Sequence, residues 1–477
     1  MSEWKKVKIG DICKIVKGTT GIASAEPGQY PLVVTAEERK TCSTYQFDCE
    51  AVCIPLVSSS GHGKKSLKNV HYQSGKFALG TILCAVIPNN PQELDARYLH
   101  QYLQFYKDII LVPLMKGAAN VSLSMKDIAT VEFPLPPIDR QRELSNLFVS
   151  LQEKQKELSA EYEKQTDYAK LLRQNILQEA IEGKLTADWR NQNPVQKGNP
   201  DYDAEALFEQ IQKGEVSPSL QPASQFSATL SPRGKAPKTP ENSREFFEEK
   251  LDSERKRTNN ARSKSLAPIT DEEKPFEIPE GWKWVRLDDL FEHKTGKTLN
   301  GSKNKGTIIR KYITTSNLYW NYFDFDKVKE MEFTEDEIKK YSIQKGDLLV
   351  CEGGDVGRTA IWNFDYSVCY QNHIHRLRSY YPINIKFYYH ILYLYKFSGY
   401  IDSQAKGMGI QGLSANRLGA FVLPLPPLRE QEEIVNKVET LLVKVTTLEN
   451  QIQDRKSLSD KLIFGIIKEN LVEKNEK

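Results

Sequence analysis

The chain contains one short proline-rich motif twice. Residues 133–144 read FPLPPIDRQREL and residues 423–434 read LPLPPLREQEEI, 290 positions apart. A residue that precedes proline is pushed toward extended backbone, whereas proline itself suits the first turn of a helix because its missing N–H would have no partner there. Each copy therefore predicts a rigid corner where a strand passes into a helix, with Asp139 as the N-cap in the first copy.

The repetition extends well beyond this motif. WKKVKIGDI at 4–12 matches WKWVRLDDL at 282–290, an offset of 278 that Gly18 and Gly296 also keep. Later matches keep an offset of 290: 98–100 with 388–390, 116–117 with 406–407 and 123–124 with 413–414. The second copy thus carries a net insertion of 12 residues between its two anchor regions. The chain is predicted to be one structural unit built twice.

Each proline motif is followed by apolar residues at alternating steps of four and three, the a/d pattern of a coiled coil. The predicted interface residues are Leu144, Phe148, Leu151, Leu158, Tyr162, Leu172 and Ile176 in the first copy, and Ile434, Val438, Leu441, Val445, Leu448, Ile452, Leu462 and Ile466 in the second. Both copies place a polar residue at the same rung, Gln165 and Arg455, where it would fix register. The matched patterns favour pairing of the two helices over a helix that lies on its own domain.

The remaining sequence predicts α+β domains, because neither half shows alternating βαβ order. Strand candidates are AVCIPLV (51–57), TILCAVI (81–87), DLLVC (347–351) and TAIW (359–362), and helix candidates lie at 95–109 and 384–398. We expect five segments: domain 1 at 1–138, helix 1 at 139–183, a proline-rich linker with short helices near 203–213 and 243–262 at 184–278, domain 2 at 279–428 and helix 2 at 429–472. A helix over 139–183 would be about 67 Å long, enough to span successive major-groove openings about 34–36 Å apart.

Composition bounds the function. Lys and Arg number 66 and Asp and Glu number 63, a formal charge of +3, so any basic surface must be local. The N-terminus has no apolar signal region and no run is long enough for a membrane span, which predicts a soluble, cytoplasmic protein. The seven cysteines are sparse and odd in number, which is typical of reduced, buried thiols.

No catalytic constellation stands out. The sequence lacks a G-x4-G-K-[ST] phosphate loop and the Asn/Asp-Pro-Pro-aromatic tetrapeptide of amino-methyltransferases. EGGDVGR at 352–358 is glycine-rich, but a β-turn between two strands explains it. His373 and His375, with Cys351 and Cys369 nearby, offer a possible metal site, and a half-buried polar strand is the favoured interpretation of them. We predict neither a metal nor a catalytic residue.

Two polar, lysine-rich loops suit nucleic acid instead: SSSGHGKKSLK at 58–68 and KTGKTLNGSKNKGTIIRKY at 294–312. Lysines and short donors there can contact phosphates, and amide or arginine side chains can pair with base edges. The candidate DNA-binding residues are Ser59, His62, Lys64, Lys65, Lys68, Lys116, Asn120, Lys297, Asn300, Lys303, Lys305, Arg310, Asn317, Arg358, Gln371, Asn372, Lys406 and Gln411. A solvated loop is the alternative for each of them.

The chain resembles the specificity subunits of type I restriction–modification systems. The resemblance rests on the two PLPP corners, LLRQNILQEAIEGKLTADWR at 171–190, PFEIPEGWKWVRLDDL at 275–290 and GDLLVCEGGDVGRTAIW at 346–362. It covers essentially the whole chain. The linker is long for this family, and the DWR at 188–190 has no counterpart in the second copy.

The resemblance implies a non-catalytic DNA-specificity subunit. Each domain would be a target recognition domain that reads one half of a split, asymmetric double-stranded DNA target. The two helices would pair antiparallel as a spacer and dock two adenine-methylating modification subunits and two restriction subunits. S-adenosylmethionine, ATP and Mg would belong to those partners, and none to this chain. An enzyme that acts alone and a coiled-coil adaptor that binds only protein are the alternatives.

Overall fold

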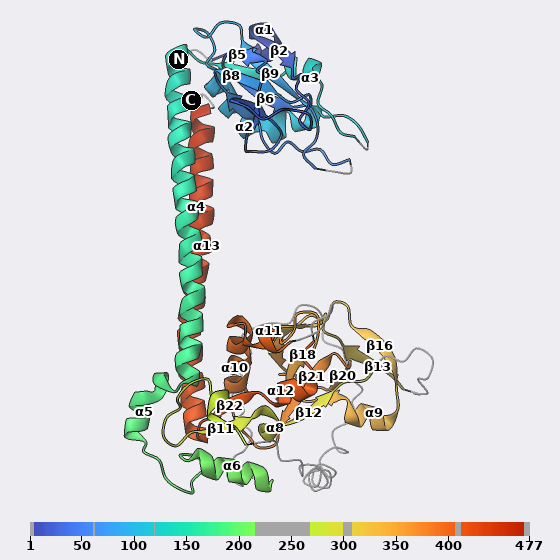
Figure 1. Ribbon diagram of the computed structural model, residues 1–477, viewed down its shortest axis with the longest axis vertical. Coiled ribbons are helices and arrows are strands. Elements are labelled where there is room, and N and C mark those ends of the chain that lie inside the picture. Colours follow the sequence, from blue (N-terminus) through green and yellow to red (C-terminus); the bar gives the residue numbers. More distant parts are fainter. Residues whose placement is uncertain are drawn as a thin grey trace, which may run out of the picture. The chain divides into compact units, whose positions relative to one another are not determined.

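The computed structural model describes residues 4–60, 63–118, 120–214, 268–298, 308–405 and 412–471. The chain divides into two compact units, residues 1–165 with 451–477 and residues 166–450. Each unit therefore consists of one mixed helix-and-sheet domain with its share of two long helices, α4 and α13 (Figure 1). None of the helices within these ranges is long and apolar enough to cross a membrane.

The first domain contains two four-stranded sheets, ordered β2-β9-β6-β7 and β4-β3-β8-β5. Its elements are β1 (Lys5–Lys8), α1 (Ile9–Ile12), β2 (Cys13–Lys17), β3 (Tyr30–Val33), β4 (Lys40–Cys42), β5 (Phe47–Asp48), β6 (Ala51–Pro55), β7 (His71–Gln73), β8 (Lys76–Leu79), β9 (Leu83–Pro88), α2 (Ala96–Ile110), η1 (Val112–Leu114), α3 (Met125–Ala129) and β10 (Glu132–Leu135). Strand β6 is buried throughout, as an apolar β-branched run in a central strand should be.

The second domain repeats this topology, with sheets ordered β12-β21-β18-β19 and β16-β13-β20-β17. Its elements are β11 (Lys283–Arg286), α8 (Leu287–Leu290), β12 (Phe291–Thr295), β13 (Ile308–Ile313), β14 (Leu318–Tyr319), β15 (Tyr322–Phe323), β16 (Lys329–Phe333), α9 (Glu335–Lys340), β17 (Ser342–Ile343), β18 (Leu348–Cys351), β19 (Thr359–Ile361), β20 (Val368–Tyr370), β21 (Ile374–Ser379), α10 (Ile385–Phe397), α11 (Tyr400–Gln404), α12 (Ala415–Gly419) and β22 (Val422–Leu425). The four predicted strands and two predicted helices are present as β6, β9, β18, β19, α2 and α10. The extra hairpin β14-β15 accounts for part of the predicted insertion.

Glycine is required at one repeated position. A side chain at Gly18 would lie 2.2 Å from the carbonyl oxygen of Gly80, and one at Gly296 would lie 2.3 Å from that of Tyr370. At this point a loop leaves the first sheet and passes directly over the end of a strand in each domain. The shared glycine therefore reflects the same close approach of two backbones.

Both proline motifs form the predicted corner between strand and helix. β1 pairs antiparallel with β10, and β11 pairs antiparallel with β22, so the first proline of each motif lies within a strand pair. The long helices α4 (Ile138–Ile181) and α13 (Leu428–Leu471) start just after the last proline of each motif. The N-cap prediction is wrong, because Asp139 already lies inside the first turn of α4. Its charge still lies where the helix dipole favours an anion.

A buried glutamine fixes each corner. The Gln141 amide donates to the carbonyl oxygens of Glu93 and Pro136, at 2.9 and 2.8 Å, and accepts from the N–H of Asp95 at 2.8 Å. Gln431 likewise donates to Pro426 and accepts from the N-cap residue of α10. Both side chains are fully buried. Each glutamine thereby ties the start of a long helix to the start of the helix in its own domain.

Helices α4 and α13 each have 44 residues and pair antiparallel. In the first unit Arg140 donates to Asn470 at 3.1 Å and Arg455 to Gln165 at 3.4 Å, and in the second Arg173 pairs with Glu449 at 3.0 Å. The two polar rungs predicted from the repeat therefore contact each other. A contact between equivalent positions of two repeats is what a matched antiparallel pair requires.

Most of the predicted interface residues are buried or half-buried: Leu144, Phe148, Leu151, Leu158, Tyr162, Ile176, Ile434, Val438, Leu441, Val445, Ile452 and Ile466. Three predictions are wrong, since Leu172, Leu448 and Leu462 are 45, 38 and 64 % exposed. In each case the next residue along the helix, Arg173, Glu449 or Ile463, occupies the less exposed position. A strict seven-residue step drifts by about 20° per heptad on a straight helix, which moves the contact stripe forward by one position.

The predicted linker 184–278 is not uniform. Residues 184–214 form η2 (Lys184–Thr186), α5 (Ala187–Gln192) and α6 (Ala204–Lys213), and the buried side chains of α6 pack into the core of the second unit. Residues 268–278 also return to that core through Phe276 and Ile278 after a short turn, η3 (Asp271–Glu273). The predicted helix at 203–213 is therefore present, and the one at 243–262 lies outside the described residues.

Candidate nucleic-acid interface

Two loops of the first domain lie against each other and bring several predicted DNA contacts together. Val57 forms a β-bridge with Ser122, and Ser58 donates its N–H to the carbonyl of Val121 at 2.9 Å. The candidates on these loops that lie within the described residues are Ser59, Lys64, Lys65, Lys68, Lys116 and Asn120, and all are exposed. They form one surface, which we call the lysine loop cluster.

Serine side chains stiffen this cluster. The Ser58 hydroxyl donates to the carbonyl of Lys64 at 2.5 Å, and Ser60 and Ser66 share a hydrogen bond of 2.7 Å. The Ser59 hydroxyl accepts from the N–H of Lys68 at 2.9 Å. Such short local bonds hold the loop backbone without consuming lysine side chains. The described residues on the two sides of this loop are therefore tied to each other.

Lys116 differs from the other lysines because it has an acidic neighbour. Its ammonium lies 3.0 Å from the Asp127 carboxylate, which also accepts from Ser124 at 2.7 Å. The Ser124 hydrogen bond, and then Lys116, lower the pKa of Asp127. Part of the positive charge at Lys116 is thus already compensated within the domain.

In the second domain two predicted DNA contacts are buried instead. Lys297 is 5 % exposed, pairs with Glu337 at 2.6 Å and donates to the carbonyl of Glu332. Asn317 is 2 % exposed, accepts from the N–H of Thr314 and donates to the carbonyl of Asp324. Their polar groups are occupied by the domain itself. Both predictions are corrected to structural roles.

Arg358 is also engaged internally. It closes the hairpin of β18 and β19, where EGGDVGR forms the predicted turn, and its guanidinium donates to the carbonyl of Thr315. It also lies 4.8 Å from the centre of the Tyr319 ring, and its side chain is 16 % exposed. A cation over an aromatic face stabilises the local packing, so Arg358 supports the hairpin rather than projecting from it.

The remaining candidates divide into two groups. Arg310 is exposed on β13, and Gln371 and Asn372 are half-buried beside the end of β12, so their contact with DNA stays a prediction. The other candidates lie outside the described residues: His62, Asn300, Lys303, Lys305, Lys406 and Gln411.

The alternative metal site is not assembled. His373 is exposed and His375 is fully buried, so the two histidines do not converge. Burial raises the pKa of the Cys351 thiol to about 11 and that of Cys369 to about 12, which disfavours the thiolate that a metal requires. Over the described ranges, His, Cys, Asp and Glu side chains nowhere gather in threes as metal ligands.

Sequence reasoning missed a chain of buried polar groups around His375. His293 Nε2 lies 3.0 Å from His375 Nδ1, and His375 Nε2 lies 2.7 Å from the carbonyl oxygen of Leu413. Burial, and then the charge of His293, lower the pKa of His375 to about 4. The two histidines lie on β12 and β21, and only the pairing of these strands brings them together. No local sequence motif therefore predicts their contact.

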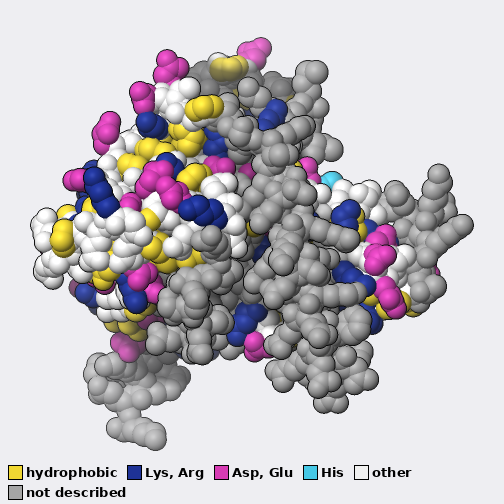
Figure 2. Space-filling model, turned by 90° about the horizontal axis from the view of Figure 1, so that it is seen from below, with side chains coloured by type: hydrophobic (Ala, Val, Ile, Leu, Met, Phe, Trp, Pro, Cys, Tyr) yellow, Lys and Arg dark blue, Asp and Glu magenta, His cyan; other side chains and the backbone are white. Residues whose placement is uncertain are grey.

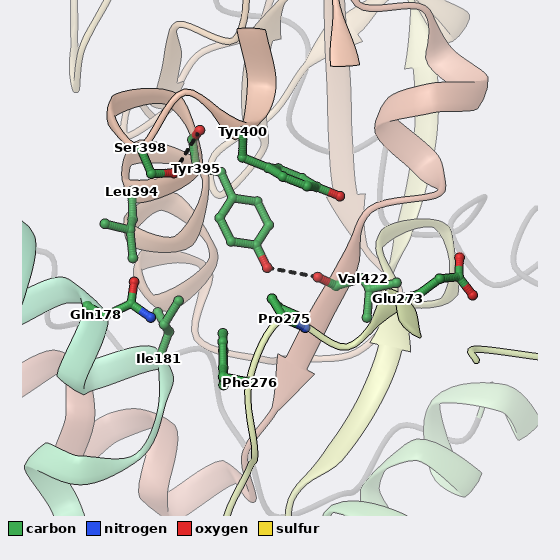
Figure 3. Close-up of a pocket in the computed structure, with 10 residues that line it drawn as sticks. All are labelled: Gln178, Ile181, Glu273, Pro275, Phe276, Leu394, Tyr395, Ser398, Tyr400 and Val422. Atoms are coloured by element: carbon green, nitrogen blue, oxygen red, sulfur yellow. Dashed lines mark hydrogen bonds between the residues drawn. The ribbon is translucent and has the colours of Figure 1, made fainter. Parts of the chain in front are cut away.

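A pocket of about 190 Å³ in the second unit offers no reaction chemistry. Gln178 and Ile181 line one side, and Pro275 and Phe276 lie across from Tyr395 (Figure 3). The Tyr395 hydroxyl donates to the carbonyl of Val422 at 2.9 Å. The one carboxylate of the lining, Glu273, forms an ion pair with Arg286 at 3.0 Å. The lining therefore has no free acid–base pair.

Charge on the described surface is mixed. In Figure 2 the Lys and Arg side chains alternate with Asp and Glu side chains over the visible described part of one face. This distribution agrees with the formal charge of +3. Attraction to a polyanion must therefore come from individual loops such as the lysine loop cluster.

The two domains share one sheet topology, and each is joined by a proline corner to a helix of 44 residues, which defines a class of tandem-repeat α+β proteins. The model of the type I restriction modification DNA specificity domain matches residues 1–165 and 279–455. The chain belongs to this family. The family gives it a DNA sequence-specificity role rather than a catalytic one.

Individual relatives agree with this assignment. The chain is 22 % identical to the type I restriction enzyme EcoDI specificity subunit of Escherichia coli, over 98 % of this chain and 87 % of the relative. It is 24 % identical to the EcoAI specificity subunit of Escherichia coli, over 41 % of this chain and 34 % of the relative.

Two solved structures share the fold. A chain from a study of complex assembly and conformational transition of the type I R-M system matches with a TM-score of 0.62 at 14 % identity, over 99 % of this chain and 98 % of that one. The HsdS subunit from Thermoanaerobacter tengcongensis matches with a TM-score of 0.51 at 14 % identity, over 99 % of this chain and 97 % of that subunit.

Proposed function

We propose that each domain reads one half of a bipartite, asymmetric DNA target through equivalent loops that differ in charge. The N–H of Leu123 donates to Leu56 in the first domain, and that of Leu413 donates to Glu352 in the second, both at 2.9 Å. The loops that follow these acceptors therefore occupy equivalent places. This equivalence of position, combined with a difference in content, carries the proposal.

The two loops offer different chemistry to DNA. The first presents the exposed lysines Lys64, Lys65 and Lys68, whereas the second, 352–358, contains Glu352 and Asp355 and turns its arginine inward. Lysines contact phosphates without regard to sequence, while acidic side chains can accept from cytosine amino groups. Two such loops on one scaffold would read two unlike half-sites.

The partners we propose are two adenine-methylating modification subunits and two restriction subunits, which would hold S-adenosylmethionine, ATP and Mg. Exposed apolar side chains on the paired helices support a docking role, including Tyr168 at 59 % exposure, Val443 at 65 % and Leu458 at 63 %. Because the scaffold repeats, it can offer two equivalent surfaces to two copies of one partner. Such a complex would act in the cytoplasm.

The decisive experiment is to purify the full chain with its modification subunit and to sequence the DNA that the complex methylates. We expect one bipartite, asymmetric target, and no methylation by either protein alone. Methylation or cleavage by this chain alone would show an enzyme. A complex that forms but does not retain DNA would show a protein-only adaptor.

Removing the lysine loop cluster should weaken DNA binding by the complex. If Lys64, Lys65 and Lys68 are replaced together by alanine, the slope of log affinity against log salt should fall by about 0.9 for each DNA phosphate that the loop no longer neutralises. Fluorescence anisotropy of a labelled target duplex across a salt series measures this slope. The matched control replaces Lys154, Lys156 and Lys164, which are exposed on α4. Equal slopes for the two triple variants would contradict the prediction.

A further inference from the structure

A continuous chain of hydrogen bonds runs through the second domain from α8 to Leu413, two residues before α12. The Asp288 carboxylate lies 3.1 Å from His293 Nδ1. His293 Nε2 lies 3.0 Å from His375 Nδ1, and His375 Nε2 lies 2.7 Å from the Leu413 carbonyl oxygen. The elements that carry these residues lie together in the second unit (Figure 1).

Both ends of this chain of hydrogen bonds are acceptors. A carbonyl oxygen and a carboxylate can only accept, so His375 must donate from Nε2 and His293 must donate from Nδ1. The remaining ring nitrogens, His293 Nε2 and His375 Nδ1, face each other, so each imidazole is held at both of its nitrogens.

The two histidines are shielded from solvent. His375 is fully buried and the His293 side chain is 7 % exposed, whereas the Asp288 side chain is 38 % exposed. The charged groups on neighbouring elements are engaged elsewhere. Arg376 on β21 pairs with Glu292, the Asp289 carboxylate accepts from the N–H of Arg286, and Arg417 on α12 donates to the carbonyl of Gln404.

The repeat of this site in the first domain is made of other residue types. The positions equivalent to Asp288 and His293 are Gly10 and Ile15, at the offset of 278. Cys84 pairs with Lys17 as His375 pairs with Thr295, so the third position is a thiol. The chain of hydrogen bonds is therefore particular to the second domain.

The packing around Asp288 is complementary to this difference. A side chain at Gly419 would lie 2.1 Å from the Asp288 carboxylate, whereas in the first domain the equivalent residue is Ala129, which packs at Gly10. The glycine at position 419 thus leaves room for the Asp288 carboxylate in the second domain.

The chain of hydrogen bonds ends at Leu413, whose backbone N–H and carbonyl groups are both hydrogen-bonded. Its N–H donates to the carbonyl of Glu352 at 2.9 Å, at the start of the 352–358 loop, and the Glu352 N–H donates to His373. Its carbonyl accepts from His375, and the next residue, Ser414, is the N-cap position of α12. A shift of Leu413 would therefore move the loop that we assign to reading the second half-site.

We propose that Asp288, His293 and His375 are positioning residues that hold Leu413 and the 352–358 loop in the reading geometry. This inference rests on the proposed function of that loop. Breaking this chain of hydrogen bonds should weaken selectivity for the second half-site and leave the first half-site unaffected.

The test uses the complex of the full chain with its modification subunit, acting on a random DNA library. Sequencing of the methylated products gives the selectivity at each half-site separately. His293→Leu should reduce selectivity at one half-site only, by about tenfold, the loss expected for one charge-assisted hydrogen bond. Lys339→Gln, which changes an exposed residue on α9 of the same domain, is the matched control and should match the wild type.

Asp288→Asn provides a second variant that should fold. The asparagine side-chain oxygen can still accept from His293 Nδ1, so most of the selectivity that His293→Leu loses should be kept.

Equal loss at both half-sites, or unchanged selectivity in His293→Leu, would overturn the inference. A wild-type complex without any sequence selectivity would instead refute the proposed function.

Discussion

Replacing Arg190 with leucine should lower the free energy of unfolding of the second unit by about 3–5 kcal/mol. Arg190 lies 2.5 Å from the carboxylate of Glu430, which is 1 % exposed at the start of α13. That carboxylate also accepts from the Thr186 hydroxyl and the Trp282 indole, both at 2.7 Å. Without Arg190 a buried charge would lose its counter-ion. Urea denaturation followed by tryptophan fluorescence measures the change.

The first repeat supplies a control for this prediction. The position equivalent to Glu430 is Arg140, whose side chain is 42 % exposed. Arg140→Leu should change stability by no more than about 1–2 kcal/mol, because it removes one exposed ion pair and one hydrogen bond to Asn470 but leaves no buried charge. If the two leucine variants are equally stable, Glu430 does not depend on Arg190. The network also gives GKLTADWR, at 183–190, a structural purpose: it binds the second corner.

Replacing Gln431 with leucine should destabilise the second unit by about 3 kcal/mol, because two buried backbone groups would lose their partners. Leucine has a similar size, so the loss would come from the hydrogen bonds to Pro426 and Asn384 rather than from a cavity. Gln141→Leu should destabilise the first unit at least as much. Gln141 makes the two hydrogen bonds that Gln431 makes, and it also donates to the carbonyl of Glu93. Hydrogen exchange read separately in α2 and α10 would locate each loss.

A glutamine on the paired helices is the matched control. Gln165 is half-buried, accepts from Arg455 at 3.4 Å and donates to Glu161 on its own helix at 3.0 Å. Gln165→Leu should leave stability unchanged or raise it, because a polar residue in a coiled-coil seam lowers stability. Exchange that rises throughout the molecule in Gln431→Leu, rather than in α10 and its surroundings, would contradict a local role for the corner.

The scaffold could be predicted from the sequence because it occurs twice. Two copies of one proline motif and two matched apolar stripes constrain each other, and the structure has both corners and two helices of 44 residues. The errors are local. Helix α4 starts one residue before the predicted N-cap Asp139. The less exposed positions move to Arg173 and Ile463, because a seven-residue step is slightly shorter than two turns of the helix.

The reading surface was harder to predict, because a polar residue type does not reveal whether it is buried. Lys297 and Asn317 look like DNA contacts in the sequence, yet Glu337 and the backbone of residues 324–332 occupy them. The proline-rich composition of 184–278 likewise suggests a linker, although the carbonyl of Pro200 accepts from the N–H of Leu428 at the second corner. These contacts join residues far apart in sequence, so no local pattern encodes them.

The complementary pair of Asp288 and Gly419 has a consequence for inheritance. The equivalent residues of the first domain are Gly10 and Ala129, so there the glycine is at the first position and the larger residue at the second. A recombination event that joined the start of one domain to the end of the other would bring Asp288 against an alanine, or leave Gly10 facing a glycine. In the first hybrid the alanine side chain would clash with the Asp288 carboxylate, and in the second the two glycines would leave a void. Natural exchange between such domains should therefore preserve each pair, with breakpoints outside the interval from position 288 to position 419.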